Sequence, residues 1–251
     1  KLDWAILSRR FDTVVAVSED IRQSLINRHR WSQTTVEVIH NGIDVPPSSG
    51  PRSGHGQPFR IGTVGRLVPV KDYDLFLEVA QSLLNLRETV QLSILGEGPL
   101  RAHLETRVKQ LGLRDVVQIL GFCPDPTEFY HSLDLYLNTS IHEGIPLSIL
   151  EAMACGLPIV APWVGGIPEI VKHDDHGILI QTRKASDFAA ACRRLMREHK
   201  TRERMGHNGR ERVYQSFSSE RMANSYRHLY WRLCGVSIDS ECGDVRVCTA
   251  P

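Results

Sequence analysis

Two glutamates, Glu143 and Glu151, are separated by seven residues within residues 138–171, a stretch that reads as strand, loop, helix, strand, loop and helix. Glu143 lies in the loop before the first predicted helix, and Glu151 lies inside that helix. The first amides of a helix have no partner within it and carry partial positive charge, so they favour an anion. We therefore expect an anion at the turn that opens the helix, which consists of Gly144, Ile145, Pro146, Leu147 and Ser148.

The two carboxylates need neutral partners that donate hydrogen bonds, because they cannot also face the anion. A carboxylate accepts two hydrogen bonds from a vicinal diol, so hydroxyl-rich groups suit both glutamates. A ligand with phosphate in its middle and a sugar at each end satisfies the whole stretch, and a nucleotide sugar has this form. The same spacing also fits an ordinary helix with one solvated Glu and a second Glu near its N-terminus, where the helix dipole favours it.

The residues around the two glutamates extend the pattern. Ala-Met-Ala-x-Gly-x-Pro follows Glu151 at 152–158, and Gly165-Gly166-x-Pro168-Glu169 forms a second block. This run resembles the signature of family 4 of the retaining glycosyltransferases (glycosyl transferases group 1), which have the GT-B fold. The resemblance covers nearly all of residues 12–232.

The resemblance implies a role for each residue of the signature. Glu143 would bind hydroxyls of the transferred sugar, and Glu151 would bind the ribose diol. Backbone amides of residues 144–148 would hold phosphate and sugar.

A cationic loop follows the first strand after residue 58. Its letters, Gly65-Arg66-x4-Lys71, resemble the family's Gly-Arg-x4-Lys loop, which supplies two cations to the diphosphate of the donor. Breaking the bond between a sugar and a nucleoside diphosphate puts charge on the departing β-phosphate, and a guanidinium and an ammonium stabilise that charge as it develops. Such a pair can replace a metal ion, so the resemblance implies no metal. Two solvated cations beside a turn are the alternative.

Two further loops match the family. Gly98 is assigned to the donor site by the resemblance, and we expect it to adopt an unusual backbone angle. Backbone atoms near Cys123 would read the edge of the nucleobase, and we expect Phe122 in the core. His142 could act as an acid or a base, but we favour a loop residue that lines the site.

The string Asp72-Tyr73-Asp74 matches the Asp-x-Asp motif of metal-dependent glycosyltransferases. Those enzymes have another fold, and here the string begins a helix, where Asp is favoured as a cap and in the first turn. We therefore predict a helix start and no metal site.

The rest of the chain predicts an α/β fold. Strands are expected at 59–64, 90–95, 116–120, 133–137, 158–161 and 177–180, with helices between them. This alternation predicts a Rossmann-like parallel sheet with helices on both faces, the C-terminal half of a GT-B fold, followed by a helical C-terminus. The helix at 73–86 should bury positions 76, 79, 80, 83 and 84. We expect the helical segment at 203–217 to break near Gly206 and Gly209.

We divide the chain into five parts, of which only the linker (46–57) is indicated by its composition. The resemblance implies a remnant of an N-terminal acceptor domain (1–45), a nucleotide-sugar-binding domain (58–217) and a cross-over helix (218–235), and a tail (236–251) follows. We expect Ser18 and either Ser218 or Ser219 to cap helices.

The composition is that of a globular protein, with 41% hydrophobic and 24% charged residues and a net charge of +1. Nothing in it indicates nucleic acid, and no apolar run of about 18 residues could span a membrane. Residues 183–212 hold ten Lys/Arg against four Asp/Glu; an anionic surface is one interpretation, and the solvated side of a helix pair is the one we favour. Cys155 and Cys192 should pack as small apolar residues, while Cys242 and Cys248 could pair, although a reduced state is simpler.

We predict a retaining, metal-independent glycosyltransferase of cell envelope polysaccharide biosynthesis. It would transfer a hexose from a nucleoside diphosphate sugar to a glycan, lipid or small-molecule acceptor. A UDP-sugar is the first choice of donor and a GDP-sugar the second, from family frequency alone. The alternatives are a donor-binding subunit of a split enzyme, a non-catalytic nucleotide-sugar-binding module and a sugar-nucleotide epimerase.

The chain begins without Met and lacks the family's N-terminal glycine loop and acceptor pocket, so we expect a fragment that binds donor but transfers poorly or not at all. The acceptor would bind through the missing domain. We expect a cytoplasmic location, and the family leaves open a peripheral attachment at the inner face of the membrane.

Overall fold

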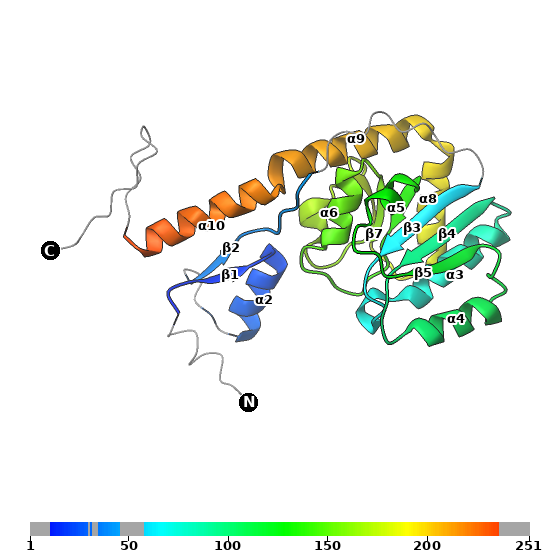
Figure 1. Ribbon diagram of the computed structural model, residues 1–251, viewed down its shortest axis with the longest axis horizontal. Coiled ribbons are helices and arrows are strands. Elements are labelled where there is room, and N and C mark those ends of the chain that lie inside the picture. Colours follow the sequence, from blue (N-terminus) through cyan, green and yellow to red (C-terminus); the bar gives the residue numbers. More distant parts are fainter. Residues whose placement is uncertain (1–10, 30, 32–34, 46–57, 236–251) are drawn as a thin grey trace.

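The computed structural model describes residues 11–29, 31, 35–45 and 58–235. Expectations for residues 1–10, for the linker at 46–57 and for the tail with its two cysteines lie outside this part. The described residues form a small N-terminal unit (residues 11–29, 31 and 35–45) and a larger α/β domain (residues 58–217, here the main domain), followed by a long helix (Figure 1).

The N-terminal unit contains two strands and one helix. Strand β1 (Val14–Ala16) pairs in parallel with β2 (Val36–Val38), and helix α2 (Glu19–His29) packs on both strands. Ser18 caps α2 as predicted, because its Oγ accepts a hydrogen bond from the Ile21 amide at 3.2 Å.

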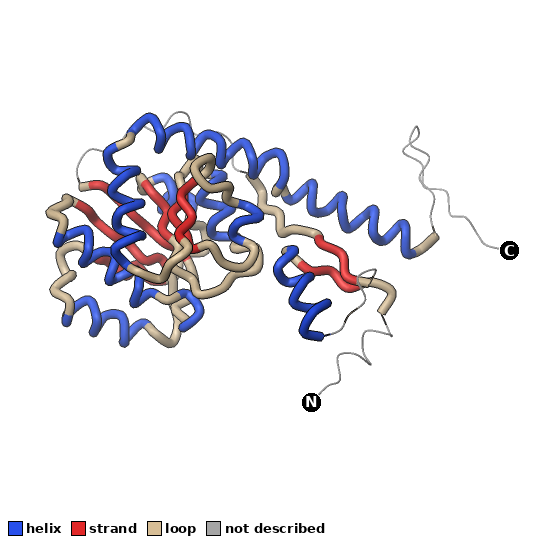
Figure 2. Tube along the Cα trace, turned by 180° about the vertical axis from the view of Figure 1, so that it is seen from behind, coloured by secondary structure: helices blue, strands red, loops and turns tan. Residues whose placement is uncertain are grey.

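The main domain is built on a parallel six-stranded sheet in the order β5-β4-β3-β6-β7-β8. Its strands are β3 (Phe59–Val64), β4 (Val90–Leu95), β5 (Val117–Gly121), β6 (Leu135–Leu137), β7 (Ile159–Pro162) and β8 (Gly177–Ile180). Apolar residues on both sides of these strands require cover on both faces, which Figure 2 shows. The predicted Rossmann-like α/β fold is confirmed.

Helices form a layer on each face of the sheet. One layer contains α3 (Tyr73–Asn85), α4 (Arg101–Gln110) and α8 (Ala185–Arg197). The other contains α5 (Thr127–His131), α6 (Leu147–Ala154) and α7 (Ile167–Ile170), and α9 (His199–Ser216) packs on both α6 and α8. No helix within the described ranges has both the length and the apolar character needed to cross a bilayer.

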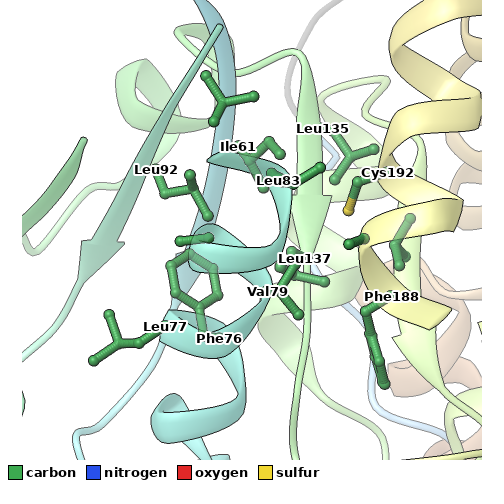
Figure 3. Packing of buried hydrophobic residues seen from close by; sticks show 14 of the residues in the cluster. Ile61, Phe76, Leu77, Val79, Leu83, Leu92, Leu135, Leu137, Phe188 and Cys192 are labelled. Atoms are coloured by element: carbon green, nitrogen blue, oxygen red, sulfur yellow. The ribbon is translucent and has the colours of Figure 1, made fainter. Parts of the chain in front are cut away.

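The larger core lies between the sheet, α3 and α8 (Figure 3). The apolar positions predicted for α3 face it: Phe76, Val79, Ala80 and Leu83 are fully buried, and Leu84 is partly buried. Cys155 and Cys192 are buried as predicted. Burial raises the pKa of the Cys192 thiol to about 12, so this sulfur packs as an unreactive apolar group.

Glu169 on α7 joins the main domain to the N-terminal unit. Its carboxylate accepts hydrogen bonds from the amides of Glu19 at 2.9 Å and Asp20 at 3.2 Å, the first residues of α2. The Nε2 of His40 lies 2.8 Å from the same carboxylate. These amides have no partner within α2, so Glu169 satisfies them and fixes the position of the helix.

Helix α10 (Ser219–Leu233) runs from the main domain alongside the N-terminal unit (Figure 1). Ser218 caps it, since its Oγ accepts a hydrogen bond from the Arg221 amide at 3.3 Å. Near the other end of α10, Arg232 forms an ion pair with Glu37 of the N-terminal unit. The predicted cap is therefore confirmed, and α10 contacts the N-terminal unit through this ion pair.

Most of the basic residues at 183–212 form ion pairs or hydrogen bonds with other groups of the chain. Arg193 and Arg197 pair with Glu88 at 2.7 and 3.0 Å, and Arg212 donates to the carbonyl of Ile170 at 2.9 Å. Other side chains that contact acidic groups or carbonyls are Arg183, Arg194, Arg202, Arg204 and Arg210. Much of this charge therefore ties α8 and α9 to their neighbours, instead of forming a merely solvated face.

The predicted break in the helix at 203–217 is wrong, because α9 is continuous through both of its glycines. A Cβ on Gly206 would lie 2.1 Å from the carbonyl oxygen of Gly156. The glycine therefore allows α9 to approach the end of α6 more closely than any side chain would permit. Gly209 faces Met153 across the same helix contact at ordinary distances.

We predict that Gly206→Ala lowers the free energy of unfolding by about 1–3 kcal/mol, because the new methyl group would force α9 away from a backbone carbonyl. Gly209→Ala is the matched control on the same helix. Its Cβ would meet only Met153 side-chain atoms at 3.6 Å or more, so we expect no loss, or a gain of about 0.5–1 kcal/mol from helix propensity. Urea unfolding measures both, and equal effects would contradict the close-approach argument.

Candidate active site

The strand order reverses between β3 and β6, the two central strands of the sheet. From β3 the chain builds outward through β4 and β5, and from β6 it builds outward in the other direction through β7 and β8. In open parallel sheets, ligands bind at the carboxyl ends of the strands where such a reversal occurs. Here the loops that leave this point are residues 65–72, after β3, and residues 138–146, after β6.

Lys71 and Glu143 meet across this reversal. The Lys71 Nζ lies 2.6 Å from Glu143 Oε1, and the Ser140 hydroxyl donates to the same oxygen at 2.6 Å. The two charged side chains are only 20% and 12% exposed. The ion pair is therefore largely shielded from water, and each charge is compensated mainly by the opposite charge of its partner.

Glycines place the loop after β3 directly on the loop after β4. A Cβ on Gly96 would lie 1.9 Å from the carbonyl oxygen of Gly65, and one on Gly98 would lie 2.6 Å from the carbonyl oxygen of Leu67. The hydroxyl of Tyr73 also donates to the Gly65 carbonyl at 3.0 Å. Gly98 thus supports the cationic loop through backbone contact, and its predicted contact with a donor stays a prediction.

A second glycine pair supports the loop that carries Glu143. Cβ atoms on Gly165 and Gly166 would lie 1.9 and 2.0 Å from the carbonyl oxygens of Glu143 and Gly144. The Gly166 amide donates to the Glu143 carbonyl at 3.0 Å. These two glycines therefore fix the backbone of the site by direct contact.

Arg66 and the turn before α6 present hydrogen-bond donors in this region. Arg66 is exposed, and its guanidinium has no hydrogen-bond or ion-pair partner among the described residues. Within the same part of the chain, the amides of the turn and of the first helical residues also lack an acceptor, namely those of Gly144, Ile145, Leu147 and Ser148. Together these donors favour an anion.

Glu151 lies in a separate cluster on α6. The hydroxyl of Tyr130 donates to Glu151 Oε2 at 2.7 Å and to the carbonyl of Ser148 at 3.2 Å. Burial, with smaller contributions from Tyr136 and Glu151, raises the pKa of Tyr130 well above its ordinary value, so this phenol stays protonated and donates. Glu151 borders a pocket of about 400 Å³, which Asp125 and other residues near the start of α5 also line.

Three further residues that were predicted near the site are Phe122, Cys123 and His142. Phe122 is 74% exposed, so its predicted place in the core is wrong. It follows the last strand residue, Gly121, whose positive φ of 82° turns the chain outward. Cys123 is exposed beside it, and its Sγ contacts the Asp125 carbonyl at 3.1 Å. His142 faces α2, where its Nε2 lies 3.6 Å from Asp20 Oδ2.

The predicted helix start at Asp72 is confirmed. Asp72 caps α3 by accepting a hydrogen bond from the Leu75 amide at 3.4 Å, and it forms an ion pair with Arg183. Asp74 instead contacts His103 and Arg107 of α4 at 3.0 and 3.3 Å. Across the described ranges, no three His, Cys, Asp or Glu side chains gather in a way that could hold a metal ion.

The sequence did not reveal the contacts of three side chains that hold this site, Ser140, Tyr130 and Arg183, nor the contact of Glu169 with α2. Ser140 lies three residues before Glu143, a spacing that could have indicated their contact. Tyr130 and Arg183 lie far along the chain from the groups they contact, and Arg183 is one cation in a basic stretch. Glu169 belongs to a recognised motif, but its contact with α2 has no local signal.

Comparison with known protein families identifies the class. The family model described as Glycosyl transferases group 1 matches residues 51–212, and the model described as Glycosyltransferase Family 4 matches residues 1–46. The chain belongs to the glycosyl transferases group 1 family.

Related proteins agree with this assignment. An uncharacterized glycosyltransferase of Methanocaldococcus jannaschii is 29% identical over 231 residues, which cover 86% of this chain and 59% of the relative. The amylovoran biosynthesis glycosyltransferase AmsK of Erwinia amylovora is 34% identical over 147 residues, 55% of this chain and 36% of the relative. The chain thus spans about half the length of the curated relatives it matches.

A solved structure supports the fold. The Anabaena protein Alr3699/HepE, determined in complex with UDP, has a TM-score of 0.82 and 23% identity, with 91% of this chain and 66% of that chain covered. The predicted GT-B-type α/β architecture is confirmed by this likeness.

We predict that Lys71 and Glu143 are energetically coupled before any ligand binds. Lys71→Met should lower the free energy of unfolding by about 1–3 kcal/mol, because it leaves a shielded carboxylate without its cation. Adding Glu143→Gln should recover part of that loss, giving a coupling energy of about 1–3 kcal/mol in a double-mutant cycle measured by urea unfolding.

The exposed pair Arg194–Glu198, whose side chains are 42% and 44% exposed, is the control. Its cycle should give less than about 0.5 kcal/mol. A Lys71–Glu143 cycle that is additive to within the same margin would contradict the pairing.

Proposed function

We propose that this chain carries the donor site of a retaining, metal-independent glycosyltransferase that transfers a hexose from a nucleoside diphosphate sugar. The observation that carries the proposal is the Lys71–Glu143 pair at the reversal in strand order, at 2.6 Å. A cation and a hydroxyl-binding carboxylate lie side by side there, as a diphosphate joined to a sugar requires.

The diphosphate would bind between Arg66 and Lys71. Cleavage of the glycosidic bond places negative charge on the leaving β-phosphate, and two fixed cations stabilise that charge as it develops. Arg66 provides a planar guanidinium for directional hydrogen bonds, and Lys71 provides a point charge. The free amides near Gly144 add donors for phosphate oxygens. These cations supply the charge stabilisation that a metal ion supplies elsewhere.

The two glutamates would bind the two sugars of the donor. Glu143 would accept hydrogen bonds from hydroxyls of the transferred hexose. The phosphate would then replace Glu143 as the partner of the Lys71 ammonium. Glu151 would accept from the ribose diol, and Tyr130 holds its carboxylate in place at 2.7 Å. The pocket beside Glu151 has about 400 Å³ for the nucleoside, next to the loop that contains Cys123, whose backbone would read the base.

Retention follows from the geometry that we propose for transfer. The leaving phosphate and the incoming acceptor hydroxyl would occupy the same face of an oxocarbenium-like sugar, so the phosphate could accept the proton of the acceptor. A UDP-sugar is the first candidate donor, in keeping with the UDP bound to the Anabaena structure. A glycan acceptor in polysaccharide synthesis is in keeping with the amylovoran relative.

A non-catalytic module, a split-enzyme subunit and an epimerase are not favoured. Both curated relatives described above are named glycosyltransferases. Analysis of the products by NMR separates the epimerase from the other candidates, because an epimerase returns an isomeric nucleotide sugar.

The first experiment is a thermal-shift and calorimetry screen of the chain against UDP-, GDP- and ADP-sugars, with and without EDTA. We expect one base to raise the melting temperature and binding to persist in EDTA. Arg66→Ala and Glu151→Ala should each weaken binding about 10–100-fold, the value of one or two hydrogen bonds to a charged group.

Exposed side chains of the same types are the controls. Arg114→Ala and Glu128→Ala remove a charge from exposed positions of the main domain and should leave the affinity within about two-fold. Binding that requires a divalent cation, or that survives both Arg66→Ala and Glu151→Ala, would refute the proposal.

A further inference from the structure

Arg183 reaches from the edge of the sheet toward its centre. It lies in the loop between β8, the edge strand, and α8. Its guanidinium donates to the carbonyls of Thr139 at 2.6 Å and Ser140 at 2.8 Å, in the loop after β6, and forms an ion pair with Asp72, after β3. One side chain therefore joins three loops across the reversal in strand order.

Both ends of this contact adjoin the Lys71–Glu143 pair. Asp72 directly follows Lys71, and the hydroxyl of Thr139 donates to the Lys71 carbonyl at 3.1 Å. The hydroxyl of Ser140 donates to Glu143 at 2.6 Å. The backbone atoms that Arg183 holds thus belong to the residues that hold the cation and the carboxylate.

The backbone of Asp72 has an unfavourable conformation that the contact with Arg183 helps to maintain. Asp72 has a φ of 47°, in the left-handed region that is unfavourable for a residue with a side chain. Its carboxylate must also cap α3. A fixed guanidinium and the cap hydrogen bond together keep the carboxylate, and hence the turn that carries Lys71, in one position.

We propose that Arg183 is a positioning residue of the donor site, which sets the separation between Lys71 and Glu143 for the diphosphate and the transferred sugar. The inference rests on the proposed function for its ligand, although the positioning of the ion pair can be measured without ligand. Because the fork must reach two carbonyls and a carboxylate at once, Lys cannot replace Arg here.

The test compares Arg183→Lys and Arg183→Gln in the full 251-residue chain. The probes are UDP-glucose and UMP, or the GDP-mannose and GMP pair if the screen selects guanine. We expect both variants to weaken binding of the sugar nucleotide about ten-fold or more, since small misplacement of binding groups has effects of this size. Binding of the monophosphate, which depends on Glu151 and the base pocket, should stay within about two-fold.

Lys184→Ala is the matched control, because Lys184 lies in the same loop and also carries a positive charge. Its side chain makes no hydrogen bond or ion pair with the described residues. The substitution should leave both affinities unchanged. Equal weakening of both probes by Arg183→Lys would indicate a general structural role, and wild-type affinity in Arg183→Lys would mean that charge alone suffices. Either result would overturn the proposal.

A measurement without ligand separates this inference from the proposed function. The Lys71–Glu143 double-mutant cycle is repeated in the Arg183→Lys background, where we expect the coupling energy to fall by half or more. If the wild-type chain binds no nucleotide sugar, the proposed function fails, and the cycle still decides the role of Arg183. An unchanged coupling energy would overturn that role.

Discussion

The Lys71 ammonium and the Glu143 carboxylate face each other at 2.6 Å where the strand order of the sheet reverses. This contact depends on two loops from different strands meeting with little water between them. Gly165 makes such a meeting feasible, because the backbone packs where a Cβ would stand 1.9 Å from the Glu143 carbonyl oxygen. A shielded pair also requires that both charges be present, since loss of either charge leaves the other without compensation.

The same requirement explains how the site can remain stable before and after a donor binds. In the unliganded chain, Lys71 and Ser140 satisfy Glu143. A diphosphate would offer Lys71 a stronger anion, and sugar hydroxyls would offer Glu143 new donors, so each half-buried charge would exchange one partner for another. Glu151 has a similar arrangement, with the Tyr130 hydroxyl as its partner. Under the proposed function, ligand binding would therefore replace existing hydrogen bonds and would not require the burial of unpaired charge.

The sequence predicted much of the fold because the signals are local. Buried strands alternate with helices, caps such as Ser18 and Ser218 precede helices, and Lys71 and Glu143 lie in loops that follow strand ends. The fold was therefore predictable to within a few residues, whereas Arg66, Lys71 and the two glutamates became candidates through the resemblance of their motifs to those of the family. What was missed depends on contacts between distant segments. The role of Gly206 depends on Gly156 across a helix contact, and that of Arg183 depends on carbonyls of another loop. Glycine ordinarily destabilises a helix, so the sequence predicted a break. The close approach of a second backbone, which requires glycine at this position, is not visible in the sequence.

The most direct measurement is a crystal structure of the chain with the nucleoside diphosphate sugar that binds best. The account predicts β-phosphate oxygens within hydrogen-bond distance of Arg66 and Lys71, hydroxyls of the hexose on Glu143, and the ribose diol on Glu151. It also predicts that the Lys71 Nζ moves from Glu143 to the phosphate. A donor bound elsewhere, with the Lys71–Glu143 contact at 2.6 Å intact and both glutamates free of sugar, would contradict it.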